Sequence, residues 1–235
     1  MSLGFFVTGT DTGVGKTRVA CALLHAFAAQ GKITVGMKPV AAGCAETAQG
    51  LRSDDVEALR AASRVKAPRD LINPYAFKPA IAPHIAARQA GIEIDMQVIK
   101  NAFNQLTGMA EVVIVEGVGG FKVPLNSSAD SADLAGLLGL PVILVVGMRL
   151  GCLNHALLTA EAIESRGLQL AAWVANCLDP RMQALEENLA ALEKKLEQAP
   201  LSVLEFAPNL QTAEVAAGLA VSSLDLIGKA VWKKA

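Results

Sequence analysis

A glycine-rich turn between an apolar run and a helical pattern holds the residues best suited to chemistry. The turn, Gly9–Thr17, reads Gly-Thr-Asp-Thr-Gly-Val-Gly-Lys-Thr. Backbone N–H groups of such a turn, aided by the positive end of the following helix, hold phosphate oxygens. Lys16 would neutralise the β and γ phosphates of a nucleoside triphosphate, and the Thr17 hydroxyl would ligate Mg²⁺. The turn therefore predicts an ATP- and Mg²⁺-dependent P-loop enzyme, although the strict G-x-x-x-x-G-K-[ST] spacing would place a glycine at Thr10.

An acid and a lysine follow two other apolar runs. Glu116 comes directly after Val112–Val115, where a buried strand has no solvated face to explain it. Because a second carboxylate on Mg²⁺ is expected at the end of a neighbouring strand, Glu116 is the candidate, and a glutamate that caps the next turn is the alternative. Lys38 follows Ile33–Met37. A lysine at the end of a strand is usually exposed to solvent. Only the presence of the phosphate-binding turn elsewhere in the chain favours a role for Lys38 in the site.

Short runs that are apolar on both faces alternate with helical patterns. Strands are expected at Phe5–Thr8, Ile33–Met37, Val112–Val115, Val142–Val146 and Leu170–Ala175. Helices are expected at Thr17–Gln30, Ile94–Leu106 and Leu153–Arg166. Strands buried on both faces are typical of parallel sheets, and alternation of strand and helix indicates a doubly wound α/β fold. We therefore expect a mostly parallel sheet with helices on both faces, in which ligands bind at the carboxyl ends of the strands.

The clearest helix start in the sequence lies near residue 180. Asp179 is suited to be an N-cap and Pro180 to be the first helical residue. Apolar side chains then recur at spacings of three and four, at Met182, Leu185, Leu189, Leu192 and Leu196. This single stripe, with Glu and Lys opposite, predicts an amphipathic helix that packs on the sheet. A short two-stranded coiled coil is the alternative.

Composition limits the classes of function. The chain has 235 residues, 52% of them hydrophobic, and a formal net charge of −1. The length suits one α/β domain over residues 1–235, and the charge argues against a sequence-independent nucleic-acid binder. The N-terminal apolar run lacks a basic region, and glycines and a proline break the longest uncharged stretch, so we expect a cytoplasmic protein without a membrane span. The 4 cysteines and 3 histidines form no disulfide or metal-binding pattern.

Several short motifs, in order across residues 5 to 176, resemble the dethiobiotin synthetase family. They are the turn Gly9–Thr17, Lys38-Pro39-Val40, Asn73-Pro74-Tyr75, Pro83-His84, Glu116-Gly117-Val118-Gly119-Gly120, Pro124-Leu125, Pro141-Val142, Gly151-Cys152-Leu153-Asn154-His155 and Val174-Ala175-Asn176. Each motif is weak alone, but the ordered set is specific. The C-terminal quarter of the chain matches the family only loosely.

The resemblance implies an ATP-dependent ligase that forms C–N bonds and closes a cyclic urea in biotin synthesis. Its substrates would be 7,8-diaminononanoate and CO₂, with ATP and Mg²⁺ as cofactors, and its products dethiobiotin, ADP and phosphate. One amine takes up CO₂ to form a carbamate, ATP phosphorylates the carbamate oxygen, and the second amine attacks the mixed anhydride. The family also implies a homodimer with active sites at the interface, and no nucleic-acid or membrane partner.

The resemblance further implies roles for individual residues. The catalytic residues would be Thr12, Lys16 and Lys38. By ligand, the implied contacts are Gly13, Val14, Gly15, Lys16, Thr17, Asn176, Pro208 and Leu210 for the nucleotide; Thr17, Asp55 and Glu116 for Mg²⁺; and Thr12, Lys38, Ala42, Gly151, Cys152, Leu153 and Asn154 for the diamine. In the family, the N–H groups of the segment 151–154 bind the substrate carboxylate from the opposite subunit. The residues alone favour a plain strand-to-helix turn there.

Departures from the family pattern leave alternatives open. Asp54 is adjacent to Asp55 and could hold the metal instead, and a loop aspartate before a helix is more often an N-cap. Ala42 stands where related enzymes often carry a serine, and Gly13 replaces a frequent glutamate. The segment Leu204–Pro208 lacks the usual glycine before the base-binding loop.

Two other functions are compatible with a P-loop chain. A switch ATPase of the partition or division-site type carries an added lysine in its phosphate loop, but this chain has Asp11 at that position and Thr12 in place of a glycine. An amidoligase acting on another carboxylate is the second alternative, although the chain leaves no room for an attached glutaminase domain. The choice between ATP and another nucleoside triphosphate stays open.

Overall fold

The computed structural model describes residues 2–206, 215, 216, 218, 219 and 224 of the chain. The strands are β1 (Leu3–Gly9), β2 (Thr34–Met37), β3 (Val40–Ala42), β4 (Ala45–Thr47), β5 (Gly50–Arg52), β6 (Tyr75–Phe77), β7 (Val112–Glu116), β8 (Val142–Met148), β9 (Leu170–Cys177) and β10 (Ser202–Leu204). The helices are α1 (Lys16–Ala29), α2 (Asp54–Ala62), α3 (Arg69–Ile72), α4 (Pro83–Gln89), α5 (Met96–Thr107), α6 (Ser131–Leu138), α7 (Cys152–Ser165) and α8 (Leu185–Leu196).

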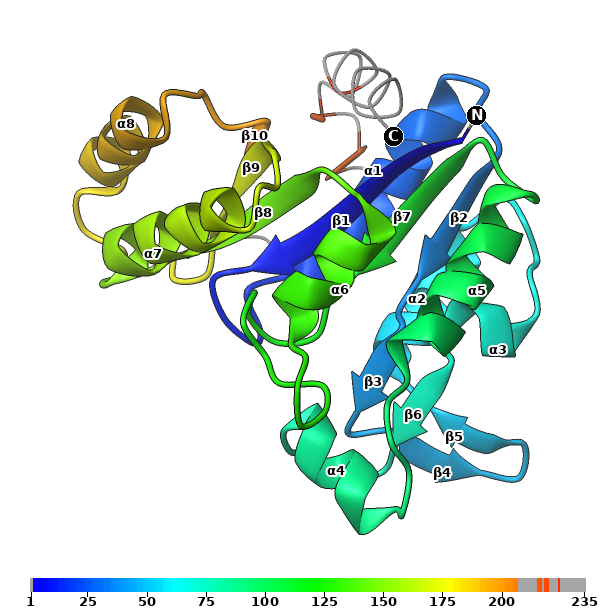
Figure 1. Ribbon diagram of the computed structural model, residues 1–235. Helices are drawn as coiled ribbons and strands as arrows, with labels where there is room; N and C mark the ends of the chain where they lie inside the picture. The colour runs from blue at the N-terminus through cyan, green and yellow to red at the C-terminus, as the bar shows by residue number, and fades with distance from the viewer. Residues whose placement is uncertain (1, 207–214, 217, 220–223, 225–235) are drawn as a thin grey trace.

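The main sheet has the strand order β10-β9-β8-β1-β7-β2, and every neighbouring pair in it is parallel. Helices cover both faces of this sheet (Figure 1). The predicted doubly wound, mostly parallel α/β fold is therefore confirmed. Two small sheets, the parallel pair β3–β6 and the antiparallel pair β4–β5, extend beyond the carboxyl edge of the main sheet (Figure 1). Within the described residues, no helix has the length and apolar character that crossing a membrane requires.

Alternate side chains of the strands enter separate cores because successive residues of a strand point to opposite faces. Phe5 and Val7 pack with α1 on one face, whereas Phe6 packs with α5 and α6 on the other. A third cluster joins β8 and β9 to α7 and α8, and it includes Trp173, which has no exposed surface. Both faces of the strands are thus buried, which is why these segments read as continuous apolar runs.

The parallel arrangement brings the candidate functional residues to one edge. Since the carboxyl ends of parallel strands lie together, the ends of β1, β2, β7 and β9 meet there with the residues that follow them. Local signals set where the neighbouring helices begin. Asp95 caps α5 by accepting a hydrogen bond from the Gln97 N–H, and Asp130 forms a capping box with Asp133 at the start of α6.

The predicted helix start at Asp179–Pro180 is wrong. Helix α8 begins at Leu185, and the residue before it, Ala184, has a left-handed backbone with φ of 54°. The Asp179 carboxylate accepts a hydrogen bond from the Arg181 N–H and pairs with the Arg181 guanidinium, which makes a local turn. Aspartate side chains stabilise such turns as readily as helix starts, so the same residue type serves either structure.

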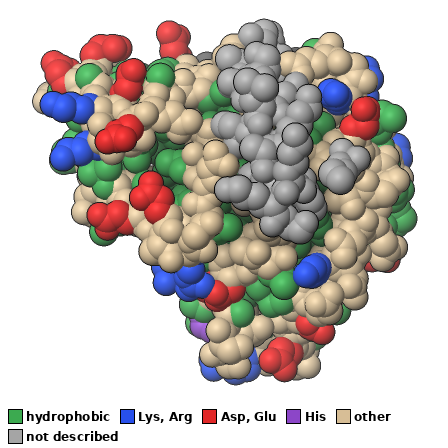
Figure 2. Space-filling view, turned by 45° about the horizontal axis from the view of Figure 1, so that its top comes forward, with side chains coloured by type: hydrophobic (Ala, Val, Ile, Leu, Met, Phe, Trp, Pro, Cys, Tyr) green, Lys and Arg blue, Asp and Glu red, His purple; other side chains and the backbone are tan. Residues whose placement is uncertain are grey.

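The predicted apolar stripe packs within the chain, where α8 lies against α7 and its side chains join the cluster that also holds residues of β8 and β9. Leu192 is fully buried in the cluster with β8, β9 and α7, and the other four stripe residues are partly buried against that cluster. Acidic and basic side chains gather at the corner of the molecule where α8 lies (Figure 2). The helix therefore packs on α7 and this cluster with one face and presents charges to solvent with the other.

This packing predicts unequal effects of two truncations on α8. Leu192→Ala should lower the free energy of unfolding by about 2–5 kcal/mol because it leaves a cavity in a closed cluster. Leu189→Ala, on the same helix but only partly buried, should cost clearly less. Urea denaturation at two protein concentrations measures both. Equal costs, or a cost for Leu192→Ala that depends on concentration, would contradict packing within the chain.

Candidate active site

The phosphate-loop segment runs from the end of β1 at Gly9 to the start of α1 at Lys16. Two of its glycines have a left-handed backbone, with φ of 76° at Gly13 and 92° at Gly15. This conformation is strained for residues with a side chain. Gly15 is the N-cap of α1 and brings no side chain to its N–H groups. The first N–H groups of the helix are therefore available to an anion.

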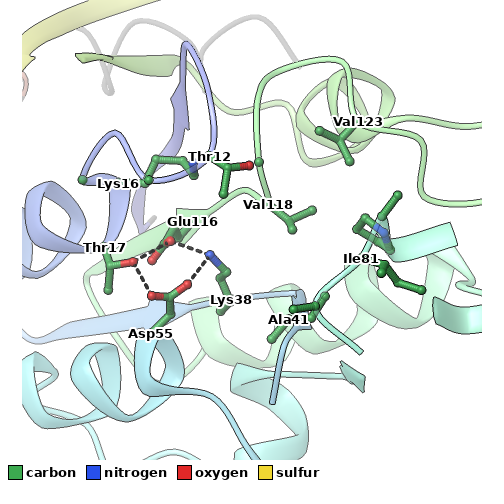
Figure 3. A pocket seen from close by; sticks show the side chains of 17 residues that line it. Thr12, Lys16, Thr17, Lys38, Ala41, Asp55, Ile81, Glu116, Val118 and Val123 are labelled. Carbon is green, nitrogen blue, oxygen red and sulfur yellow. Dashed lines mark hydrogen bonds and ion pairs between the residues drawn. The ribbon is translucent and has the colours of Figure 1, made fainter. Parts of the chain in front are cut away.

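A cluster of charged side chains lies beneath this loop (Figure 3). The Lys38 ammonium lies 2.9 Å from Asp55 Oδ2 and donates a short hydrogen bond to Glu116 Oε1. The Thr17 hydroxyl lies 2.8 Å from Asp55 Oδ1 and 2.9 Å from Glu116 Oε1. One residue from each of α1, α2 and β7, together with the residue that follows β2, thus converge on one point. Asp55 is not the N-cap of α2, because Ser53 occupies that position, and Asp54 is exposed.

Burial and attraction act in opposite directions within this cluster. Lys38 is 4% exposed and Glu116 is 1% exposed. Burial raises the pKa of Glu116, and the Lys38 ammonium opposes the rise. Burial alone would lower the pKa of Lys38, but attraction from Glu116 and Asp55 outweighs it and raises that pKa. Burial likewise works against ionisation of Asp55, and Lys38 and the Thr17 hydrogen bond still hold its pKa below the usual value. Lys38 is therefore the cation that favours the charged form of both carboxylates, and for Asp55 it outweighs the effect of burial.

Lys16 lies close to this cluster but belongs to the loop. It is 6% exposed, and its ammonium donates a hydrogen bond to the Asp11 carbonyl oxygen at 2.9 Å. Burial, followed by repulsion from Lys38, lowers the pKa of Lys16 to about 8. A buried ammonium with one carbonyl partner has further N–H groups to offer. The oxygens of a bound phosphate would accept hydrogen bonds from these N–H groups, and its negative charge would stabilise the Lys16 ammonium.

The loop and the cluster form one end of a cavity of about 700 Å³. Figure 3 shows Thr12, Lys16, Thr17, Lys38, Asp55 and Glu116 at the polar end. The opposite end is lined by apolar side chains, among them Ala41, Ala42, Ile81, Val118 and Val123. The cavity therefore suits a ligand with a charged, phosphorylated head and an aliphatic tail.

Asn176 connects the last predicted strand to the phosphate loop. It lies near the carboxyl end of β9, is 4% exposed, and donates a hydrogen bond from Nδ2 to the Val14 carbonyl at 2.8 Å. Its Oδ1 atom is buried and has no hydrogen-bond partner among the described residues. An unpaired buried acceptor is costly, so this oxygen is suited to an N–H donor of a ligand.

Other predicted contacts lie apart from this cavity. Gly151, with φ of 93°, is the N-cap of α7, and Cys152, Leu153 and Asn154 form the first turn of that helix. None of these four is among the residues that line the cavity in the described chain. Pro208 and Leu210 lie outside the described residues.

Sequence reasoning missed the apolar wall formed by Ile81, Val118 and Val123. The three wall residues lie within or close to Pro83-His84 and Glu116–Gly120, two of the motifs that carry the family resemblance. Closeness to these motifs is the signal in the sequence that could have marked the three residues as candidates. An isoleucine or valine in a wall is indistinguishable in sequence from one in the core. Only the fold brings the segment before α4 close to the segment after β7.

The parallel sheet, the glycine loop entering α1, and the lysine and threonine at the start of that helix define a nucleotide-binding P-loop enzyme. A protein-family model described as an AAA domain matches residues 4–214. Among curated relatives, the ATP-dependent dethiobiotin synthetase BioD of Nitrosospira multiformis is 55% identical, covering 96% of this chain and 98% of the relative. The enzyme of the same name from Pseudomonas paraeruginosa is 50% identical, covering 95% of this chain and 97% of the relative. The chain belongs to the ATP-dependent dethiobiotin synthetase family of ligases.

Solved structures of lower identity share the fold. The cell division ATPase MinD of Pyrococcus furiosus has a TM-score of 0.58 at 16% identity, covering 97% of this chain and 100% of that chain. MinD of Pyrococcus horikoshii, complexed with Mg-ADP, has a TM-score of 0.55 at 16% identity, covering 95% of this chain and 89% of that chain. At such identity the likeness concerns the fold alone. The relatives that are about half identical favour the synthetase over the switch ATPase or another amidoligase.

The glycine loop predicts different outcomes for two alanine substitutions. A Cβ at Gly15 would lie 2.4 Å from Asn176 Nδ2, whereas a Cβ at Gly13 would meet nothing within 4 Å. Both substitutions carry the backbone strain of a left-handed residue, about 1–2 kcal/mol. Only Gly15→Ala should also displace Asn176 and the loop, and should weaken nucleotide binding about tenfold or more. Calorimetric titration measures the affinity, and equal losses in the two variants would contradict a direct contact between Gly15 and Asn176.

Proposed function

We propose that the chain closes a cyclic urea from 7,8-diaminononanoate and CO₂, using ATP and releasing ADP and phosphate. The observation that carries the proposal is the convergence of Thr17, Lys38, Asp55 and Glu116 beneath a phosphate loop, at the polar end of a cavity with an apolar wall. A phosphoryl group and a carbamate need cations and hydroxyl donors at such a place, and an aliphatic diamine needs the apolar wall. The family of the chain supports the same chemistry.

The proposed reaction places few covalent demands on the protein. One substrate amine adds to CO₂ and loses a proton to give a carbamate. A carbamate oxygen then takes the γ-phosphoryl group of ATP, and ADP departs. The second amine attacks the carbamate carbon, loses a proton, and expels phosphate as the ring closes. Catalysis then depends on positioning and on neutralising charge. We assign these tasks to Lys16 for the β and γ phosphates, and to Lys38 and Thr12 for the carbamate and the transferring group.

We assign Mg²⁺ to Thr17, Asp55 and Glu116. Two carboxylates and a hydroxyl are the hard oxygen donors that this cation prefers, and Glu116 Oε2 is buried without a hydrogen-bond partner among the described residues. Bound Mg²⁺ would neutralise charge on the phosphate oxygens during transfer. Carboxylates that hold a divalent cation no longer depend on Lys38 as their counter-ion. The Lys38 ammonium is then available to the carbamate.

The adenine base, the phosphates and the diamine have separate proposed sites. The buried Asn176 Oδ1 would accept a hydrogen bond from the amino group of adenine, and Pro208 and Leu210 would wall the base. Gly13, Val14 and Gly15 would hold the phosphates through their N–H groups. The diamine would lie beyond Lys38, with Ala42 beside its amines in place of a side chain that could hydrogen-bond to them.

The substrate carboxylate is the reason for proposing a homodimer. The segment Gly151–Asn154 begins α7. The Cys152 N–H donates to the Arg149 carbonyl, whereas the Leu153 and Asn154 N–H groups have no intrahelical acceptor and suit a carboxylate. The segment does not line the cavity of its own chain. We propose that it serves the site of a second copy across a two-fold axis. Residues 1–235 would form one P-loop domain of a cytoplasmic enzyme.

The reaction is tested by mixing the protein with ATP, Mg²⁺, bicarbonate and 7,8-diaminononanoate and measuring products by mass spectrometry. ADP release should require both the diamine and CO₂, dethiobiotin should appear one for one with ADP, and chelation of Mg²⁺ should stop both. Lys16→Ala should lower turnover by about 10²–10³, the scale of one lost transition-state donor. Steady ATP hydrolysis without the diamine, stimulated by DNA or lipid, would point to a switch ATPase instead.

The shared site is tested by mixing two inactive variants, Lys16→Ala and Asn154→Ala, under conditions that exchange subunits. Random exchange makes half of the dimers mixed, and each mixed dimer holds one intact site, so activity should recover to about a quarter of wild type. The control is a mixture of Lys16→Ala with Glu116→Ala, whose lesions fall in the same chain's site and should restore nothing. Recovery of nothing in the first mixture, with Asn154→Ala inactive alone, would exclude the shared site.

A further inference from the structure

Asp11 is an acid within a loop that binds anions. A carboxylate next to phosphate groups lowers their affinity by like-charge repulsion. The switch ATPases considered above carry a lysine at this position, so the acid also reverses the charge expected there. The proposed assignment of phosphates and carbamate gives Asp11 no contact with substrate, and Asp11 is not among the residues that line the cavity.

The structure pairs Asp11 with a residue from another element. Asp11 Oδ2 lies 2.5 Å from Arg149 Nη2, and both side chains are about half exposed. Arg149 belongs to the turn between β8 and α7, where its carbonyl oxygen accepts the Cys152 N–H at 2.9 Å. The turn that begins α7 is therefore tied to the outer side of the phosphate loop.

The other atoms of Asp11 hold two of the loop residues that line the cavity, Thr12 and Lys16. Asp11 Oδ1 accepts the Thr12 N–H at 2.7 Å, and the Asp11 carbonyl accepts the Lys16 ammonium at 2.9 Å. The Thr12 hydrogen bond and, against the effect of burial, the Arg149 guanidinium keep the pKa of Asp11 below its usual value. Asp11 thus stays ionised, with one oxygen turned to Thr12 and the other to Arg149.

We propose that Arg149 is a positioning residue for the phosphate loop, acting through Asp11. Its guanidinium holds the Asp11 carboxylate turned away from the cavity and offsets its negative charge. Asp11 in turn orients Thr12 and Lys16. The loop gains a rigid anchor from an acid, and the bound phosphates do not meet an uncompensated charge. The inference rests on the proposed phosphate-binding role of this loop.

A double-mutant cycle tests this assignment through binding and not through turnover. The variants are Arg149→Met, Asp11→Asn, and the two combined, and the readout is calorimetric affinity for a non-hydrolysable ATP analogue with Mg²⁺. Arg149→Met should weaken binding about threefold to tenfold, the scale of one partly screened charge. The double variant should regain most of this loss, because the carboxylate that needs compensation is gone. Arg149→Lys should keep most of the wild-type affinity.

A matched control lies at the other end of α7. Arg166 pairs with Asp133 on α6, and both are partly exposed to a similar degree. Arg166→Met removes the same charge at the opposite end of α7 without touching the loop, so it should leave the affinity unchanged. If Arg166→Met weakened binding as much as Arg149→Met, the change in net charge alone would explain the effect of Arg149→Met.

Each remaining outcome separates this inference from the proposed function. A double variant that is as weak as Arg149→Met, or weaker, would show that Arg149 acts on the ligand itself, and would overturn action through Asp11. Unchanged affinity in Arg149→Met would overturn it as well. Failure of the wild-type protein to bind the analogue would instead refute the proposed nucleotide site, before any variant is compared.

Discussion

The buried ion pairs around Lys38 are the interaction on which the rest of the site depends. Lys38 and Glu116 are almost fully removed from solvent at the ends of two strands. An isolated charge at such depth is unfavourable by several kcal/mol, so each of these groups needs its partners. Asp55 and Thr17 complete the set from two helices. The relative positions of β2, β7, α1 and α2 must therefore be held closely, and the cores on both faces of the sheet do this.

The same cluster explains why a costly arrangement is retained. Buried ion pairs contribute little to stability compared with well-packed apolar residues, since desolvation offsets their attraction. Their value here lies in a preorganised set of charges beneath a loop whose N–H groups are available to an anion. A charged head and an aliphatic tail then find their matching surroundings at opposite ends of one cavity. Stability is provided elsewhere, by the three apolar clusters.

Comparison with MinD shows how little of the function lies in the fold. The two share a fold at 16% identity. In this chain the loop carries Asp11, which is paired with Arg149. Fold alone would have left both functions open. The relatives that are about half identical, and not the fold, favour the synthetase.

Much of the architecture and part of the site could be predicted from the sequence, because their signals are local. Strands buried on both faces must be apolar throughout, so all five predicted strands are present in the sheet. A glycine turn followed by lysine and threonine specifies its own backbone and helix start. Glu116 was recognisable since an acid directly after a buried strand has no solvent to face. Local signals failed at Asp179, where one residue type stabilises a turn as well as a helix.

Only the tertiary structure decided which of these residues meet. Lys38, at the end of its strand, would read as solvent-exposed, and it is buried because β7 and α2 bring two carboxylates to it. The partnership of Asp11 with Arg149 spans 138 positions in the chain, and the apolar wall joins segments with no distinguishing residue types. Periodicity and turn chemistry act over a few residues. Contacts between strand ends depend on the order of strands in the sheet, which the sequence of any one segment does not contain.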